Sequence, residues 1–491
     1  MFALVSLSAQ TEGPSIAEAQ SLQLDRPPGM HPGDEWQTLY MKGERVGFVH
    51  TVRRRAGEDW RLRYELQLDL KVMKSDQRIR SELDATLDNL LTVKEFDFTL
   101  DGGIGANLGV HGTVDGKDVE LEIRTGGTTT AQSLHLDHRP RLALTNRTLV
   151  ASQGLEVGKS FETPYFDPST MSERSATVEV IGRETIHILG ESVDAFVLRQ
   201  SLEGLQLHAW VTASGDVLKE ELPLGLVAVR ETEEEARFGM GLKHGGLASS
   251  VVAPSNPDKT DIIGATAVRL IGAIPGDQAT LARAVYELDH LPKGEFVLHE
   301  GRQALRGNRI TVTRETLPES APTLAVDKAK YAESLAPTAF IQSVHPNIVA
   351  KAKEVVAGAV DGVTQVRRIM AWLAENMTQA NVVGVPSALE TLQTMRGDCN
   401  EHATLFTALA RASGLPARLD VGMVHQEGML LYHAWVEVLL DEQWVTVDPT
   451  WGQFPADVTH LRFVRGGLRQ QLAMFNVIGR VKEVRLLEAT R

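Results

Sequence analysis

A single cysteine in the last third of the chain is the residue best suited to covalent chemistry. Cys399 is the only cysteine among 491 residues. It follows Gly397 and Asp398 and opens a run of helical periodicity, so we place it where a loop becomes a helix. The free N–H groups and the dipole of a helix N-terminus favour a thiolate. A free cysteine is also often a small buried apolar residue, so position alone leaves both interpretations open.

A histidine and an aspartate follow on two expected strands. If Leu440–Asp441 is the centre of a β-hairpin, His433 lies directly opposite Asp448. A carboxylate beside a histidine fixes the imidazole tautomer and stabilises its protonated form, and a histidine near a thiol can take the thiol proton. The alternative is a structural hydrogen bond within a sheet. A one-residue slip in the register would break the pairing.

Three expected helices and two expected strands surround these residues. Apolar residues share one face over 349–359 and again over 363–373, and Asp361–Gly362 separates the two helices. The third helix runs from Cys399 to about Ser413 and ends at Gly414. The expected strands are Tyr432–Leu440 and Gln443–Asp448.

Four motifs occur in order with short loops between them. They are Gly397–Cys399, Arg411–Arg418 with the pattern Arg-x-x-Gly-x-Pro-x-Arg, His433–Ala434–Trp435, and Trp444–Thr450 with the pattern Trp-x-x-Val-Asp-Pro-Thr. In this combination, residues 331–463 resemble the transglutaminase-like superfamily of papain-like thiol enzymes. The resemblance implies a papain-like α+β core and a triad formed by Cys399, His433 and Asp448.

The resemblance also implies acyl transfer, in which the cysteine attacks an amide carbonyl and a thioester passes to water or to an amine. The backbone N–H of Cys399 is a candidate first donor to the oxyanion. Gln379 and Asn381 are the nearest side-chain candidates for the second donor. Trp435 and Trp451 are candidates to line the substrate groove, with core packing as the alternative for both. No cofactor and no metal are implied, and we find no dense oxygen-ligand loop for Ca²⁺.

The first half of the chain predicts antiparallel β-structure. Apolar and polar residues alternate from Leu62 to Val72, and shorter runs repeat this pattern. We therefore expect a multidomain protein with a β-rich N-terminal region of antiparallel sheets and a C-terminal α+β core. The expected divisions are a lead-in over 1–35, a β-rich domain over 36–240, a linker over 241–260, a small α+β domain over 261–322 with a helix at Ala279–Leu288, and the transglutaminase-like domain over 323–491.

Composition narrows the functional classes. There are 50 Lys and Arg against 64 Asp and Glu, a net charge of −14, which argues against nucleic-acid binding. No apolar run approaches the ~18 residues of a membrane span. The first ten residues resemble the end of a secretory signal, which favours a periplasmic or secreted protein over a cytoplasmic one. The sequence does not indicate an oligomeric state.

Two other patterns resemble functional sites. Leu207–Val211 nearly repeats Tyr432–Val436, but it has no cysteine nearby and no Asp-Pro-Thr strand after it, so we interpret His208 as an ordinary strand histidine. Cys399, Glu401, His402 and His425 could form a zinc site, but the triad explains Cys399 better.

Three functions compete at this stage. The first is a thiol enzyme that acts on peptide or protein amides. The second is a non-catalytic protein that keeps the papain-like fold as a peptide-binding groove, because a fold does not guarantee an activity. The third is a structural envelope protein in which the β-rich region carries the function. The complete set of Cys399, His433 and Asp448 favours the enzyme.

Overall fold

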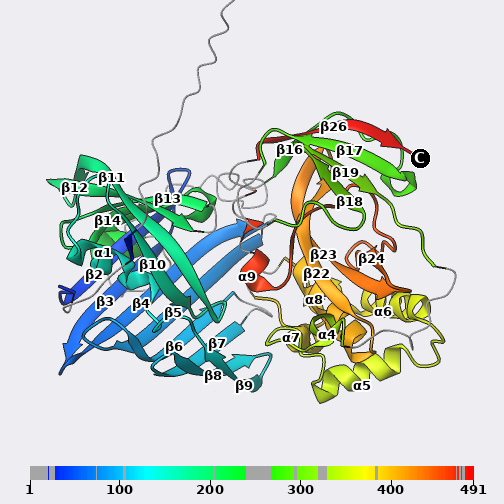
Figure 1. Cartoon of the computed structure of the whole chain (residues 1–491), viewed down its shortest axis with the longest axis horizontal. Coiled ribbons are helices and arrows are strands. Elements are labelled where there is room, and N and C mark those ends of the chain that lie inside the picture. Colours follow the sequence, from blue (N-terminus) through cyan, green and yellow to red (C-terminus); the bar gives the residue numbers. More distant parts are fainter. Residues whose placement is uncertain are drawn as a thin grey trace, which may run out of the picture.

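The computed structural model shows two regions side by side, each built around its own β-sheet (Figure 1). The N-terminal region holds a 15-stranded sheet, and the C-terminal region holds a 9-stranded sheet with helices packed against it. The structure describes residues 20–21, 28–72, 75–102, 107–202, 205–238, 267–291, 296–318, 329–381, 385–471, 473–474, 477 and 481–491. The predicted signal remnant and the predicted linker over 241–260 lie outside these residues.

The larger sheet consists of two antiparallel meanders, β2 to β9 and β10 to β15, joined where β15 pairs with β2. Its strands are β1 (Gln20–Ser21), β2 (Gly33–Met41), β3 (Glu44–Ala56), β4 (Asp59–Val72), β5 (Ser75–Leu87), β6 (Val93–Asp101), β7 (Asn107–Asp115), β8 (Asp118–Thr125), β9 (Thr128–His135), β10 (Ser160–Asp167), β11 (Ser172–Ile188), β12 (Glu191–Leu202), β13 (Leu205–Val211), β14 (Val217–Glu221) and β15 (Leu226–Glu231).

The predicted alternation accounts for these strands. In β8, Val119, Leu121 and Ile123 are buried, whereas the residues between them are exposed. A strand with this alternation buries one face in an apolar core and leaves the other in water. The prediction of an antiparallel β-rich N-terminal region is confirmed.

The smaller sheet has the order β18-β19-β17-β26-β16-β23-β22-β25, and β24 pairs with β23 outside this path. Its strands are β16 (Val268–Ile271), β17 (Arg283–Leu288), β18 (Gln303–Arg306), β19 (Arg309–Thr313), β22 (Ala417–Gln426), β23 (Met429–Leu440), β24 (Gln443–Val447), β25 (Leu461–Arg465) and β26 (Glu483–Thr490), and a separate parallel pair is formed by β20 (Thr378–Gln379) and β21 (Arg396–Gly397).

The three predicted helices of the C-terminal region are confirmed. The side chain of Asp361 accepts a hydrogen bond from the N–H of Thr364 and begins the second of them. The third ends just before Gly414, which has a φ of +85°. The helices are α1 (Asn146–Ser152), α2 (Glu233–Arg237), α4 (Ala332–Leu335), α5 (Pro346–Val355), α6 (Gly362–Asn376), α7 (Ala388–Thr394), α8 (Cys399–Ala412) and α9 (Leu468–Gln471).

One predicted element is wrong. Ala279–Leu288 does not form a helix: a single 3₁₀ turn at Gln278–Thr280 leads into β17, which pairs with β19 and β26. The spacing of the apolar residues in this segment is compatible with a helix or with a strand. The segment forms a strand because it pairs with β26, about 200 residues later in the chain. The strands from 261–322 thus belong to the same sheet as β22 and β23, while the division of the chain into domains stays a prediction.

The two regions contact each other along the segment that leads to the cysteine. Val385 is buried in the apolar core of the N-terminal region. The Gln77 side chain donates a hydrogen bond to the carbonyl of Asn381 at 3.3 Å, and that of Gln393 donates to the carbonyl of Gly126 at 3.1 Å. The N-terminal region therefore packs against the segment that precedes Cys399 in the chain.

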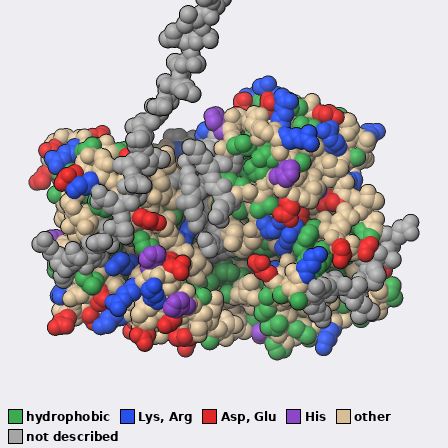
Figure 2. All heavy atoms as spheres, viewed as in Figure 1, with side chains coloured by type: hydrophobic (Ala, Val, Ile, Leu, Met, Phe, Trp, Pro, Cys, Tyr) green, Lys and Arg blue, Asp and Glu red, His purple; other side chains and the backbone are tan. Residues whose placement is uncertain are grey.

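The molecular surface is of mixed charge. Figure 2 shows acidic and basic side chains interspersed over one face. Among the described residues, every helix is too short or too polar to cross a membrane.

Candidate active site

Cys399 is the first residue of α8, the helix at the centre of the C-terminal core. Asp398 caps this helix, and its carboxylate accepts a hydrogen bond from the N–H of Asn400 at 2.9 Å. The Glu401 carboxyl accepts one from the N–H of Asp398, which completes a capping box. The backbone N–H of Ala434 on β23 lies near enough to the sulfur to lower the pKa of the thiol. The cysteine therefore lies against the residue that follows His433.

The environment of the thiol differs from the sequence-based expectation. Burial raises the pKa of Cys399 well above its usual value, and the nearby Asp398 carboxylate raises it further, although the N–H of Ala434 lowers it. The helix N-terminus was expected to favour a thiolate, but in the structure the N–H groups of Asn400 and Glu401 donate to the capping carboxylate of Asp398. We therefore expect Cys399 to rest as a neutral thiol and to need a base.

A candidate base lies on β23. The Nε2 atom of His433 lies 2.9 Å from Oδ2 of Asp448, and both residues are buried. Because a carboxylate can only accept here, Nε2 carries the proton and Nδ1 is left as the free acceptor. His433 is thus held in the tautomer that can take a proton from a thiol.

The hairpin that pairs these residues has a different register from the predicted one. Its turn is Asp441–Glu442, both with positive φ, and Leu440 faces Gln443. Relative to the prediction, every partner moves by two residues, so His433 and Asp448 are diagonal neighbours rather than directly opposite. A shift of two preserves which side chains share a face, and diagonal neighbours remain within reach of each other.

Asp448 is held by four hydrogen bonds. Oδ1 accepts from the backbone N–H groups of Thr450 and Trp451, at 2.8 and 3.2 Å. Oδ2 accepts from His433 and also from Nε2 of His460, at 3.2 Å. Although burial opposes ionisation, the two histidines hold the pKa of Asp448 far below its usual range. Asp448 is therefore a fixed carboxylate at neutral pH.

The two tryptophans of the site lie in different environments. Trp435 is only 1% exposed, so in this structure its ring is part of the core and presents almost no surface to a substrate. Trp451 is 38% exposed, and its ring stacks on that of His433 with centroids 4.6 Å apart. Of the two candidates for the groove, the structure favours Trp451 over Trp435.

Gln379 lies near the thiol by virtue of strand pairing. It is exposed on β20, which runs parallel to β21, and it is paired with Gly397, two residues before Cys399. Asn381 is two residues further on, and its carbonyl accepts the hydrogen bond from Gln77. This placement is compatible with Gln379 as an oxyanion donor, and its role stays a prediction.

His460 is the residue of the site that the sequence analysis missed. It is fully buried between Asp448 and Asp457, and its ring is edge-on to that of Trp435. The available signal was a histidine three residues after an aspartate and twelve after the triad aspartate. Nε2 of His433, Oδ2 of Asp448 and Nε2 of His460 lie within 4.8 Å of one another, the geometry of a metal-binding group, but hydrogen bonds already join the three.

The alternative zinc set is not brought together. Both ring nitrogens of His425 are engaged, one with the Gln278 side chain and the other with the N–H of Gly428. His402 uses Nδ1 to bond the carbonyl of Asp398, one turn earlier on its own helix. Glu401 belongs to the capping box of α8.

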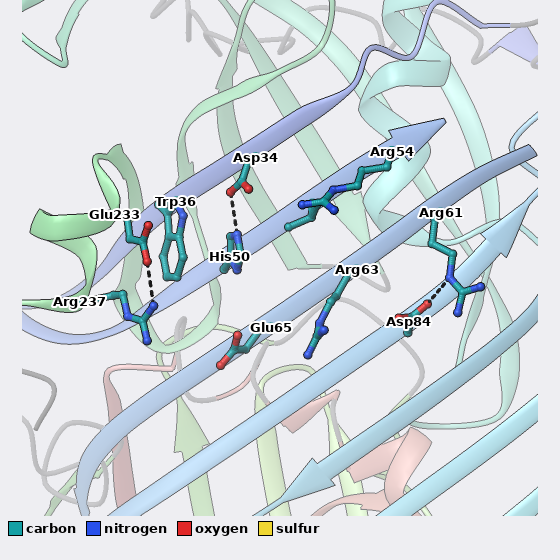
Figure 3. Close-up of a pocket in the computed structure, with 11 residues that line it drawn as sticks. Asp34, Trp36, His50, Arg54, Arg61, Arg63, Glu65, Asp84, Glu233 and Arg237 are labelled. Atoms are coloured by element: carbon teal, nitrogen blue, oxygen red, sulfur yellow. Dashed lines mark hydrogen bonds and ion pairs between the residues drawn. The ribbon is translucent and has the colours of Figure 1, made fainter. Parts of the chain in front are cut away.

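A separate cavity of about 530 Å³ lies over strands β2 to β5 of the N-terminal region, with α2 at its edge. Figure 3 shows that its walls carry charged side chains of both signs. Several are paired with each other: His50 with Asp34, Arg61 with Asp84, and Arg237 with Glu233. Its charges therefore largely cancel within the wall, and none of the triad residues lies in it.

Comparisons with known proteins agree with the motif analysis. Residues 349–449 match the model of the transglutaminase-like superfamily, so the predicted resemblance is confirmed for this part of the chain. No curated protein matches the chain.

Three solved structures have similar parts. A candidate cysteine protease from Cytophaga hutchinsonii is 17% identical over 43% of this chain and 83% of its own, with a TM-score of 0.28. The periplasmic domain of TgpA from Pseudomonas aeruginosa, bound to ethylmercury, is 20% identical over 38% and 88%, with a TM-score of 0.26. A β-barrel-like protein of the DUF1849 domain from Brucella abortus is 10% identical over 41% and 96%, with a TM-score of 0.32.

Proposed function

We propose that the protein is a thiol enzyme that transfers acyl groups from peptide or protein amides through Cys399, His433 and Asp448. One observation carries the proposal: a buried Asp448 holds His433 in the basic tautomer, and the backbone N–H of the next residue, Ala434, lies near enough to the sulfur of the only cysteine to lower its pKa. The match of residues 349–449 to the transglutaminase-like superfamily supports it.

The reaction begins with a neutral thiol. As Sγ of Cys399 attacks the amide carbonyl carbon, Nδ1 of His433 takes the thiol proton. The carbonyl oxygen becomes an oxyanion, which the backbone N–H of Cys399 and the side chain of Gln379 can stabilise. Asp448 stabilises the imidazolium that has formed.

The intermediate then collapses. The carbon–nitrogen bond breaks, His433 gives its proton to the leaving amine, and a thioester remains on Cys399. Water or a second amine attacks the thioester while His433 takes its proton, and the released thiolate is reprotonated. Water gives hydrolysis and an amine gives transamidation, and both use the same triad.

Alkylation by iodoacetamide tests the proposal without a known substrate. Since Cys399 is the only thiol, one mass increment reports it. We expect alkylation of the native protein to begin well below pH 8.5, the ordinary pKa of a free thiol, and in His433→Ala only at or above it. His208→Ala is the matched control and should behave as wild type.

The competing function predicts a different result. In a non-catalytic protein that binds peptides in the same groove, His433 has no reason to activate the thiol. A cysteine that resists alkylation until the protein unfolds, or an onset that is the same in His433→Ala, would favour that function.

A further inference from the structure

A chain of four buried side chains extends from the candidate base into the protein interior. His433 bonds Asp448 at 2.9 Å, Asp448 bonds His460 at 3.2 Å, and His460 bonds Asp457 at 3.2 Å. The proposed triad uses only the first two. His460 and Asp457 are each 1% exposed.

The contacts of His460 determine its charge. Nε2 faces Oδ2 of Asp448, and Nδ1 faces Oδ1 of Asp457. A neutral imidazole has one N–H and one lone pair, so one of these contacts would set a lone pair against a carboxylate. An imidazolium donates to both. The two carboxylates also raise the pKa of His460, although burial opposes this.

The other charged or titratable groups around His460 do not reverse this assignment. The His433 ring lies 5.8 Å away between centroids, and the neighbouring tryptophan rings are uncharged. Arg302 donates to the backbone carbonyl of Asp457 and is neutralised by Glu315 at 3.0 Å. The two aspartates are therefore the dominant charges, and a single cation between them leaves one net negative charge.

His460 is itself fixed from the far side. Oδ1 of Asp457 accepts hydrogen bonds from the N–H and the hydroxyl of Thr459, at 2.8 and 2.6 Å. Oδ2 accepts from Nε2 of the Gln453 side chain at 3.0 Å, and Oε1 of the same side chain accepts from the N–H of Asp457 at 2.8 Å. A carboxylate anchored in this way holds the imidazolium in one orientation.

We infer that His460 is a buried imidazolium that acts as a positioning residue: it fixes the Asp448 carboxylate, which in turn orients His433, and it offsets part of the charge of that carboxylate. This inference rests on the proposed function. An Asp448 that faced His433 alone would hold a proton on His433 more strongly. Sharing its charge with His460 leaves His433 free to accept the proton of a neutral thiol.

The charge of His460 can be measured directly. In full-length protein labelled with ¹⁵N-histidine, the imidazole nitrogens of the 15 histidines report their protonation by NMR. Ordinary histidines are neutral at pH 8, so we expect a histidine with two N–H protons at that pH, and its signal should be absent from His460→Gln. If the wild-type protein has no doubly protonated histidine at pH 8, the inference is overturned, whether or not the variant folds.

The positioning role is tested by the pH profile of Cys399 alkylation. Glutamine can still donate to Asp448 but carries no charge. In His460→Gln we expect the onset to move up by about one pH unit, because Asp448 now retains the proton on His433 to a higher pH. His208→Gln is the matched control. A residue with a purely structural role would lower the melting temperature and leave the onset unchanged.

The outcomes separate this inference from the proposed function. If His433→Ala changes the alkylation onset and His460→Gln does not, the inference fails and the proposed function stands. If Cys399 stays unreactive in every folded variant, the proposed function fails and the positioning role fails with it, whatever charge NMR finds on His460.

Discussion

Two nearly identical pentapeptides of this protein have different environments. Leu207–Val211 lies on β13 and Tyr432–Val436 on β23, and each contains His-Ala-Trp-Val. Both histidines pair with a carboxylate at similar distances: His208 with Glu221 at 2.8 Å and His433 with Asp448 at 2.9 Å. The pentapeptide itself and the histidine–carboxylate distance therefore do not distinguish the two histidines.

Burial and neighbours distinguish them. The side chains of His208 and Glu221 are 35% and 42% exposed, whereas those of His433 and Asp448 are 5% and 0% exposed. Water weakens the first pair, and the protein interior strengthens the second. His433 also directly precedes Ala434, whose backbone N–H lowers the pKa of the helix-terminal thiol. The reactivity of a histidine–carboxylate pair therefore depends on its burial and on the groups next to it.

The largest expected difference between the two segments is in reactivity at Cys399. At pH 7 we expect His433→Ala to slow alkylation by iodoacetamide about 100-fold or more, because the half-buried thiol loses its base. We expect His208→Ala to leave the rate within a factor of two. Equal slowing in both variants would mean that the loss comes from general destabilisation.

The carboxylate partners of the two histidines, Asp448 and Glu221, should also differ in their effect on the alkylation rate of Cys399, but by less than the histidines. In Asp448→Asn the amide can donate to Nε2 of His433, so the tautomer with a free Nδ1 is no longer fixed, and we expect about a 10-fold slower alkylation at pH 7. Glu221→Gln, the corresponding change beside His208, should have no measurable effect. A rate in Asp448→Asn equal to that of wild type would remove Asp448 from the proposed triad.

Acid should destabilise the buried network more than the exposed pair. Hydrogen bonds hold the pKa values of Asp448 and Asp457 below their usual range, so their stabilisation is present above about pH 4 and is lost as the pH falls through the folded-state values. The pKa of His460 is raised, so its contribution is present below about pH 6.5 and is lost as the pH rises through its folded-state value.

Urea unfolding at pH 7 and at lower pH tests this network. We expect Asp457→Asn to lower the free energy of unfolding by about 2 kcal/mol at pH 7 and by less in acid, where the wild type loses the same contribution. Glu221→Gln serves as the exposed control. A deficit in Asp457→Asn that does not shrink at low pH would show that packing, not charge, supplies the stability.

The smallest expected effect concerns the contact between the two regions. Gly126 and Gly127 both have positive φ, but a Cβ atom at Gly126 would lie 2.9 Å from the backbone nitrogen of Glu390, whereas a Cβ atom at Gly127 meets nothing within 4 Å. We expect Gly127→Ala to cost about 1 kcal/mol for its conformation and Gly126→Ala about 1 kcal/mol more. Equal costs would indicate that the regions separate readily in solution.

Much of the candidate site followed from local sequence. Cys399, Asp398 and Gly414 mark the start and end of a helix by their residue types, and the alternation around His433 assigned the correct faces of β23 and β24. These features depend on the intrinsic preferences of short segments and on the side-chain period of a strand. The predicted register of β23 and β24 was wrong by two residues, but side chains alternate between the faces of a strand with a period of two, so the predicted faces remained correct.

Other features depend on contacts between residues far apart in the chain. The strand at Arg283–Leu288 exists because β26, near the C-terminus, pairs with it, and local periodicity could not show this. Gln379 reaches the neighbourhood of Cys399 through a two-residue parallel pairing with Gly397. Such pairings are set by the whole fold and leave little trace in the segments themselves.

The sequence by itself determined the reactive side chains, their order, and the helix and strands that carry them, because those depend on residue type and short-range spacing. Only the tertiary structure decided that Trp435 is buried and Trp451 exposed, that Asp448 lies near enough to Cys399 to raise the pKa of its thiol, and that His460 lies between two aspartates. Burial and electrostatic environment arise from the packing of distant segments, and they determine how a given residue can react.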